Sequence, residues 1–201
     1  MPKPGAGQPS ANQRDSDMPD SRAPDAPALF EGTLNACGDI IDNRWVVVRD
    51  GDAQGAVIAN EQLDVIVPLA LWRSGSAALR AREGRVGVWL NCDDEPAELA
   101  GSIHELPIIA VNFPAFNDGR ALSVAVLLRT RMKYTGELRA IGDVRQDQLS
   151  YMRRCGFTTF TPAPDANFAE LRNGLVVMTD YYQGSVLEPS PLFRRRAPGG
   201  A

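Results

Sequence analysis

The sequence contains very little histidine and cysteine. His104 is the single histidine among 201 residues, and the three cysteines, Cys37, Cys92 and Cys155, lie far apart. An odd number of cysteines without any Cys-x-x-Cys pair argues against a disulfide framework, a zinc site or an iron–sulfur site. A His-rich metal site is excluded, and a Ser-His-Asp triad would have to use His104. We therefore expect no metal, and we interpret His104 as structural, at the end of a helix.

Long apolar runs are also missing. No stretch approaches the roughly 18 to 20 apolar residues that cross a bilayer. The first residues after Met1 lack the apolar core of a signal peptide. The chain is 44% apolar and 23% charged, which is typical of one ordinary globular domain. The sequence thus predicts a cytoplasmic protein that has no contact with a membrane.

Phosphate-binding loops are absent as well. There is no Gly-x-Gly-x-x-Gly after a strand and no loop that ends in Gly-Lys-Ser or Gly-Lys-Thr. Such loops place backbone N–H groups against the phosphates of a nucleotide. The sequence does not support a tightly held nucleotide, and no other cofactor is evident.

Lysine is scarce, with two residues against nineteen arginines, and the formal net charge is −4. The basic residues gather between positions 129 and 154, which hold seven basic and three acidic residues. A nucleic-acid binder usually has a basic footprint over much of its surface. We therefore expect no nucleic-acid partner and favour a small anion or an acidic partner. The alternative is that the use of arginine for lysine reflects genome composition.

The two ends differ in composition from the middle of the chain. Residues 1–28 contain six prolines and, apart from two methionines, no large apolar residue. Such a segment buries too little surface to offset its conformational entropy. The sequence predicts a disordered arm over 1–28, a single domain over 29–192 and a flexible tail over 193–201.

The first part of the predicted domain begins with extended chain. A β-branched stretch at 45–48 predicts a strand, and a second short strand is expected around Val57 and Ile58. A further apolar stretch, 64–67, leads to Pro68, which suits the first turn of a helix. That helix would bring Leu69, Trp72 and Leu79 to one face.

A repeating pattern follows in the second part. Short apolar strands are expected at 86–90, 107–111, 137–141 and 157–161, separated by helices at 93–103, from about 120, at 146–155 and at 167–172. Strands that are apolar throughout and alternate with helices indicate a mainly parallel sheet in an α/β fold. Four βα units are too few for a complete eight-stranded barrel, so we expect an open sheet or a partial barrel.

Ligands of such sheets bind beyond the carboxyl ends of the strands. Gly119 and Arg120 open a helix there, where free N–H groups and a guanidinium suit an anion. Asp143 follows a strand and Gly142, where a general base or a ligand-orienting carboxylate commonly lies, so Asp143 and Arg120 are the candidate catalytic residues. The candidate anion-binding residues are Asp118, Gly119, Arg120, Arg139 and Arg145. The alternative for Asp118 and Asp143 is ordinary helix capping.

Four segments carry a resemblance to a known family. They are 86–94 (VGVWLNCDD), 113–120 (FPAFNDGR), 136–144 (GELRAIGDV) with Asp147 and Gln148, and 153–157 (RRCGF). In this joint spacing the chain resembles the bacterial domain-of-unknown-function family 934 over roughly residues 45–184. Members are described as probable oxidoreductases involved in sulfite reduction.

The resemblance implies a role in assimilatory sulfate reduction, because the family's genes lie beside those for the sulfite reductase haemoprotein. It brings no mechanism, and the sequence shows no flavin, nicotinamide, haem or cluster motif. We therefore expect an accessory or electron-delivery partner of that haemoprotein, with residues 129–154 as a docking segment. Two other hypotheses stay open: a small enzyme for an anionic metabolite that uses Arg120 and Asp143, and a non-catalytic binding module tethered by residues 1–28.

Overall fold

Eight strands form one sheet in the order β2-β1-β8-β7-β6-β5-β4-β3. The computed structural model describes residues 32–49, 53–163, 166–175 and 180–196. The strands are β1 (Thr33–Asn35), β2 (Ile40–Ile41), β3 (Trp45–Val47), β4 (Asp64–Pro68), β5 (Val86–Leu90), β6 (Ile108–Phe113), β7 (Glu137–Gly142) and β8 (Thr159–Phe160). Strands β3 to β8 run parallel in chain order, and β1 pairs antiparallel with both β8 and β2. The expected mainly parallel α/β sheet is confirmed.

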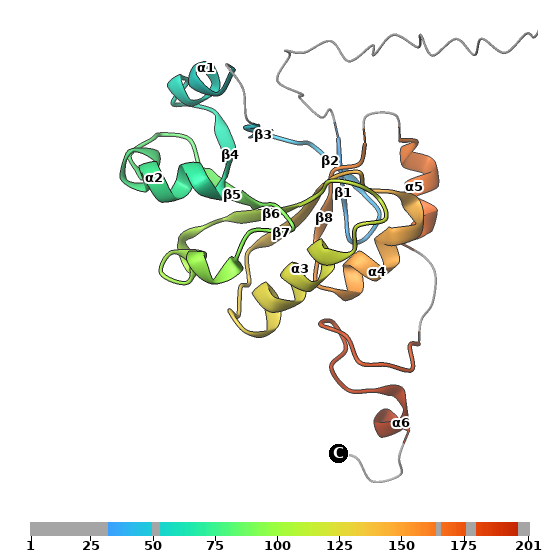
Figure 1. Ribbon diagram of the computed structural model, residues 1–201. Coiled ribbons are helices and arrows are strands. Elements are labelled where there is room, and N and C mark those ends of the chain that lie inside the picture. The colour runs from blue at the N-terminus through green and yellow to red at the C-terminus, as the bar shows by residue number, and fades with distance from the viewer. Residues whose placement is uncertain (1–31, 50–52, 164–165, 176–179, 197–201) are drawn as a thin grey trace, which may run out of the picture.

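Helices connect the parallel strands on one face of this sheet. The α-helices are α1 (Ala53–Ala59), α2 (Leu69–Arg80), α3 (Arg120–Thr130), α4 (Leu149–Arg154), α5 (Phe168–Gly174) and α6 (Leu192–Arg195), and the 3₁₀ turns are η1 (Pro96–Leu99), η2 (Ile103–Glu105) and η3 (Gln146–Gln148). Right-handed crossovers between neighbouring parallel strands place their connections on the same side. Figure 1 shows the helices around the outside of the curled sheet.

The sheet curls strongly, so its two edge strands lie close together. β2 and β3 are at opposite ends of the strand order, yet Ile41 and Trp45 are separated by only three residues. Four peptide steps span about 14 Å at most, since an extended chain covers roughly 3.3 to 3.6 Å per residue. The described strands therefore form a curled open sheet, a half-barrel, with an outer helical face and an inner face.

Two apolar clusters match the two faces. The larger lies between the sheet and the helices and includes Val65, Val88, Val111 and Leu138. The smaller lies on the inner face, where Trp45, Ile66, Ile108, Ala110 and Ile141 pack together. Alternate residues of one strand belong to different clusters because successive side chains point to opposite faces. Both faces of the central strands are thus buried, which explains why these strands are apolar throughout.

Most of the predicted elements are present. Leu69, Trp72 and Leu79 form the buried face of α2, as expected after Pro68, and Asn167 caps α5 by accepting a hydrogen bond from the Ala169 amide at 3.0 Å. Of the expected flexible tail, residues 193–195 belong to α6. The predicted disordered arm over 1–28 lies outside the described residues. Within the part of the chain that the structure describes, no helix is long and apolar enough to cross a membrane.

Two predicted elements are wrong. The strand expected around Val57 and Ile58 is the helix α1, because its alanine-rich neighbours favour a helix and both side chains pack on the larger cluster. The helix expected over 93–103 is replaced by the two 3₁₀ turns η1 and η2. There the Asp94 carboxylate accepts from the Asn91 amide at 2.6 Å and closes a turn instead of capping a helix.

Candidate functional site

The loops after β5 and β6 bring four polar side chains together at the carboxyl edge of the sheet. The Arg120 guanidinium at the start of α3 pairs with Asp118 at 2.7 Å and also with Asp93. The Cys92 thiol donates to the Asp118 carboxylate at 3.5 Å. Cys92, Asp93, Asp118 and Arg120 therefore form one cluster, which we call the strand-edge cluster.

Local chain geometry explains how this cluster is built. The Asn112 carboxamide at the end of β6 donates to Asn91 at 3.3 Å, so the ends of β5 and β6 are tied to each other. The Asp118 carboxylate accepts from the Arg120 amide at 3.1 Å, and Gly119 is the N-cap residue of α3. Asp118 thus holds the first turn of the helix as well as the Arg120 side chain, but from the position before the N-cap, so it is not itself the N-cap residue.

The electrostatics of the strand-edge cluster are dominated by the arginine. Hydrogen bonds from the Arg120 side chain and amide hold the pKa of Asp118 well below its usual range. Hydrogen bonding to Asp118 raises the pKa of Arg120 above its ordinary value. Burial and the hydrogen bond to Asp118 raise the pKa of the Cys92 thiol. The thiol stays protonated near neutral pH, so Cys92 lacks the activation that a nucleophilic cysteine needs.

Asp143 belongs to a second group at the same edge. Its carboxylate accepts from the Phe116 amide at 3.0 Å and from the Arg145 guanidinium at 2.6 Å. The Gln148 side chain donates to the Phe116 carbonyl. Asp143 does not cap a helix: it fastens the loop after β6 to the end of β7. Since both of its oxygens already accept hydrogen bonds, its position indicates a structural tie rather than a free general base.

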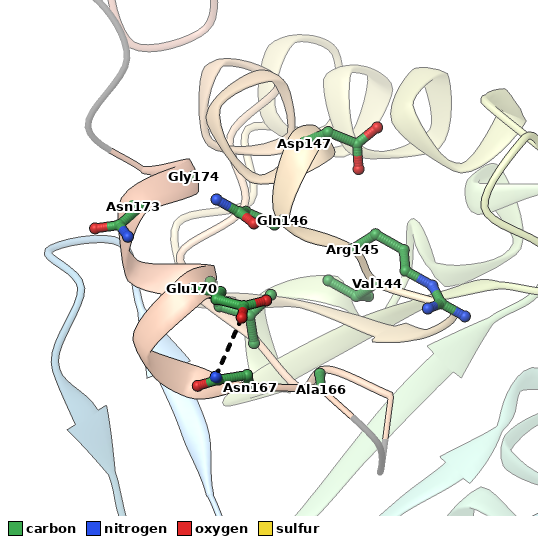
Figure 2. Close-up of a pocket in the computed structure, with 10 residues that line it drawn as sticks. Val144, Arg145, Gln146, Asp147, Ala166, Asn167, Glu170, Asn173 and Gly174 are labelled. Carbon is green, nitrogen blue, oxygen red and sulfur yellow. Dashed lines mark hydrogen bonds between the residues drawn. The ribbon is translucent and has the colours of Figure 1, made fainter.

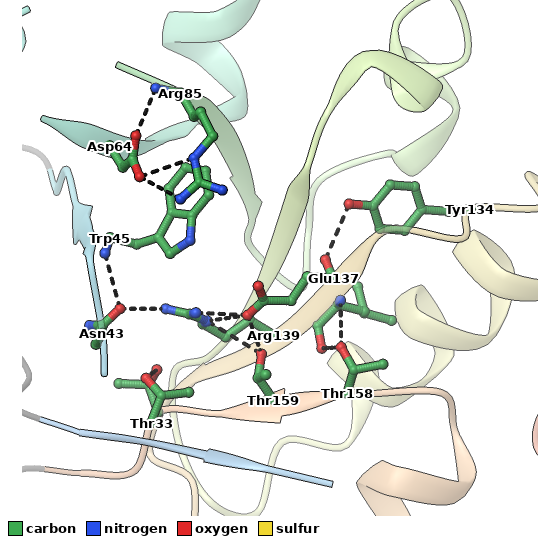
Figure 3. Close-up of polar contacts among 12 residues, drawn as sticks. Thr33, Asn43, Trp45, Asp64, Arg85, Tyr134, Glu137, Arg139, Thr158 and Thr159 are labelled. Atoms are coloured by element: carbon green, nitrogen blue, oxygen red, sulfur yellow. Dashed lines mark hydrogen bonds and ion pairs between the residues drawn. The ribbon is translucent and has the colours of Figure 1, made fainter. Parts of the chain in front are cut away.

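The structure does not bring Arg139 to this edge. Arg139 lies in the middle of β7 on the inner face, and its side chain is 2% exposed. Its guanidinium bonds to Glu137 at 2.7 Å, to Asn43 at 2.7 Å and to Thr159 at 3.3 Å (Figure 3). Arg139 and Thr159 are buried, whereas Asn43 and Glu137 are partly exposed. Arg139 therefore has a packing role there, apart from the other candidate anion-binding residues.

Arg145 lines a pocket of the described chain. This pocket measures about 950 Å³ and opens between the loop after β7 and α5. Val144 and Leu171 are buried residues of its lining, whereas its other side chains are mostly polar (Figure 2). The lining residues are Val144, Arg145, Gln146, Asp147, Ala166, Asn167, Glu170, Leu171, Asn173 and Gly174.

Sequence reasoning missed the α5 side of this pocket. Asn167, Glu170 and Asn173 come from the helix after β8, and Asn167 also bonds to Glu170 at 3.3 Å. The signal for them was the position of this helix after a parallel strand, because ligands of such folds bind beyond the carboxyl ends. The lining contains two carboxylates and one guanidinium, so the pocket suits a polar ligand better than a strongly anionic one.

The basic residues of the segment 129–154 differ in what they contact. Arg129 donates to the carbonyls of Gly156, Tyr134 and Gly136 and so clamps the end of α3. Arg139 is enclosed in the half-barrel, and Arg145 is paired with Asp143. Arg129 and Arg139 are therefore engaged within the domain, whereas Arg131, Lys133, Arg145 and Arg153 are exposed.

The fold and the carboxyl edge of the sheet define the class of protein. It is a mainly parallel α/β half-barrel in which Arg120 and Arg145, at that edge, are paired with carboxylates. Among the described residues, no group of three or more histidine, cysteine, aspartate or glutamate side chains is arranged to hold a metal ion. The family model described as "bacterial protein of unknown function (DUF934)" matches residues 87–193. The chain belongs to this family, as its four segments indicated. No curated protein and no solved structure matches it.

Proposed function

We propose that the protein is a cytoplasmic accessory or electron-delivery protein of assimilatory sulfite reduction that acts with the sulfite reductase haemoprotein. The resemblance of the four segments to family 934 supplies the pathway and the partner. The state of the strand-edge arginines supports an accessory role over direct chemistry on sulfite. The pairing of Arg120 and Arg145 with carboxylates is the observation on which we prefer an accessory role to catalysis.

Arg120 is the strongest candidate for binding a free anion at the edge of the sheet. Its guanidinium is already engaged by the carboxylates of Asp93 and Asp118, and these three side chains together carry a formal charge of −1. An anionic substrate would have to displace one carboxylate and approach the other. Arg145 is engaged by Asp143 in the same way. Because both arginines already form ion pairs with carboxylates, neither is readily available to a substrate anion. This supports a role in binding another protein over catalysis.

Growth on defined sulfur sources tests the pathway. A strain without this gene should fail to grow on sulfate and on sulfite and should recover on cysteine, because the block lies at the sulfite step. A plasmid copy of the wild-type gene should restore growth. Normal growth of the deletion strain on all three sources would overturn the proposal.

Binding to the haemoprotein tests the partner. Both proteins are purified, and the haemoprotein is titrated against this protein in a calorimeter. We expect saturable binding, and we expect the isolated protein to show no visible absorption band from a bound cofactor. A coloured protein that exchanges electrons with a donor would favour electron delivery over a purely accessory role. Absence of binding would contradict both.

A second candidate is a small enzyme or binding module for an anionic metabolite. The observation that favours it is the pocket of about 950 Å³ at the carboxyl ends of β7 and β8, where the Arg145 guanidinium offers one cationic group to a single anionic group of an otherwise polar metabolite. Sulfite, sulfate and phosphate are the probes, and the midpoint of thermal unfolding is the readout. This candidate predicts a rise in the midpoint that Arg145→Ala and Arg120→Ala reduce, whereas Arg131→Ala, a change at an exposed arginine after α3, keeps it. No rise with any of the three anions would remove it.

A further inference from the structure

The chain after the half-barrel folds into a closed loop. The amide of Leu192 donates to the carbonyl of Tyr182 at 3.2 Å, so the two ends of this loop meet. Between them, the Ser185 amide donates to the Glu188 carbonyl at 2.8 Å and makes a turn. Compact surface loops with joined ends are often functional. We call residues 180–196, which contain this loop and α6, the C-terminal loop.

The C-terminal loop is fixed on α4 along one side. The guanidinium of Arg154 lies 3.9 Å from the centre of the Tyr181 ring, and the Tyr181 hydroxyl is 2.7 Å from the Ser150 hydroxyl. The Val186 amide donates to the Arg154 carbonyl at 3.1 Å. Figure 1 shows the loop beyond α4, extending away from the sheet. Its conformation is set by these bonds before any partner arrives, which lowers the entropy cost of binding.

Three large apolar side chains of the C-terminal loop are exposed. Tyr182 is 71% exposed, Leu187 58% and Phe193 54%. The rings of Tyr182 and Phe193 are in contact, with their centres 6.0 Å apart. Solvation of such groups is unfavourable, and an exposed aromatic pair on a surface is typical of a site for another molecule. Aromatic side chains of this kind carry much of the energy of protein interfaces.

Positive charge lies directly beside the aromatic pair. Arg194, Arg195 and Arg196 follow Phe193, whereas the whole chain has a formal net charge of −4. In the described part of the chain, Arg195 is the arginine of these three that forms ion pairs, with Asp180 at 3.5 Å and Glu188 at 3.7 Å. The guanidinium of Arg194 lies 5.9 Å from the centre of the Phe193 ring. An apolar centre with a basic rim is complementary to an apolar depression ringed by carboxylates.

We infer that the C-terminal loop is the docking surface for the haemoprotein, an inference that rests on the proposed function. Tyr182, Leu187 and Phe193 enter an apolar depression on the partner, and Arg194 and Arg196 face carboxylates at its rim. The docking surface thus differs from the segment 129–154 that the sequence alone suggested.

Binding of purified haemoprotein to the full chain tests this inference by calorimetry. Tyr182→Ala combined with Phe193→Ala should weaken binding at least about tenfold, since buried aromatic anchors contribute that much or more. Arg194→Glu combined with Arg196→Glu should weaken binding most at low salt, because charge attraction is screened by ions. Ile40→Ala removes a similarly exposed apolar side chain from the edge strand β2, and Arg131→Glu reverses an exposed charge in the segment 129–154. Both controls should bind like the wild type.

The outcomes separate the two proposals. If the wild type binds and the loop variants bind equally well, the docking surface is wrong while the proposed function stands. If the wild type does not bind the haemoprotein, the proposed function fails and the inference with it. Light scattering of the wild type adds a third outcome: a dimer that becomes monomeric in the Tyr182→Ala and Phe193→Ala variant would make the loop a contact between copies. A large drop in its unfolding midpoint would show that the chain itself covers these rings, which also overturns the inference.

Discussion

The guanidinium of Arg139 donates to the carboxamide oxygen of Asn43 at 2.7 Å across the inner face of the half-barrel. Arg139 belongs to the central strand β7, whereas Asn43 lies between β2 and β3, the two edge strands. The same carboxamide oxygen accepts from the Trp45 amide at 3.1 Å. This contact therefore ties the segment that joins both edges of the sheet to its middle.

Removal of the Arg139 charge should destabilise the fold. Burial lowers the pKa of its guanidinium, and Glu137 compensates for the buried charge by pairing with it. Breaking a buried pair from one side costs about 3 kcal/mol or more, because the remaining charge loses its partner. We expect Arg139→Met to reduce the free energy of unfolding by about that amount, measured by urea titration.

Two further variants control this prediction. Arg131→Met changes an exposed arginine and should shift the free energy of unfolding by less than about 0.5 kcal/mol. Adding Glu137→Gln to Arg139→Met should recover part of the loss, since no unpaired carboxylate remains. Unfolding of Arg139→Met at the wild-type urea concentration would contradict a role in holding the half-barrel together.

Much of the fold was predictable because its strands carry a local pattern. β5, β6 and β7 are short apolar runs bounded by turns, and α3 has apolar residues at helical spacing. The curl was not predictable in this way. It depends on the pairing of β1 with β8, which are more than a hundred residues apart, and on the short link between β2 and β3. Contacts of that kind leave no periodic signal in the sequence.

The candidate site was predictable in part. Position after a strand correctly brought Asp118, Gly119 and Arg120 to one edge, as the topology of parallel sheets requires. The position of Arg120 in the sequence did not show that its guanidinium already forms ion pairs with Asp93 and Asp118. Arg139 differs from the other candidate anion-binding residues. Side chains alternate between the two faces of a strand, and this alternation directs Arg139 of β7 to the inner face. Its partner there, Asn43, lies 96 positions earlier in the sequence. A pairing over such a distance depends on the closed shape of the sheet.

Gly142 should not tolerate a side chain. Its φ is +95°, and a Cβ there would lie 2.3 Å from the Phe113 carbonyl oxygen. This backbone cannot move freely, because the next amide, that of Asp143, donates to the same carbonyl at 2.9 Å. We expect Gly142→Ala to lower the free energy of unfolding by about 2 kcal/mol or more, from the clash and the strained φ. Gly101→Ala, where a Cβ meets nothing within 4 Å, is the matched control and should change stability little.

Cys92 should react slowly with alkylating agents. Burial and the hydrogen bond to Asp118 raise the pKa of its thiol, and the thiolate is the reactive form. Asp118→Asn removes the negative neighbour and leaves Arg120 near the sulfur, so the pH at which alkylation accelerates should fall. Peptide mass spectrometry after timed iodoacetamide treatment measures the rate at Cys92, with the exposed Cys37 as the internal comparison. An unchanged pH dependence of the Cys92 rate in this variant would contradict the contact.

The pair of Asp118 and Arg120 should contribute fully to stability near neutral pH and lose this contribution gradually in acid. Hydrogen bonds from Arg120 lower the pKa of Asp118 in the folded chain, whereas an unfolded aspartate has a pKa of about 3.9. A group with a lowered folded pKa stabilises the fold fully above its unfolded pKa and loses this effect as the pH falls toward the folded value. The difference between the urea midpoints of the wild type and of Asp118→Asn should therefore be largest above about pH 5, begin to shrink near pH 4 and keep shrinking as the pH falls toward the folded pKa. Glu83→Gln changes an exposed carboxylate without an ion pair among the described residues, so it should shift the urea midpoint little at any of these pH values. If the difference in urea midpoint between the wild type and Asp118→Asn stays constant from pH 7 to pH 3, the Asp118 carboxylate acts through its shape and not through its charge.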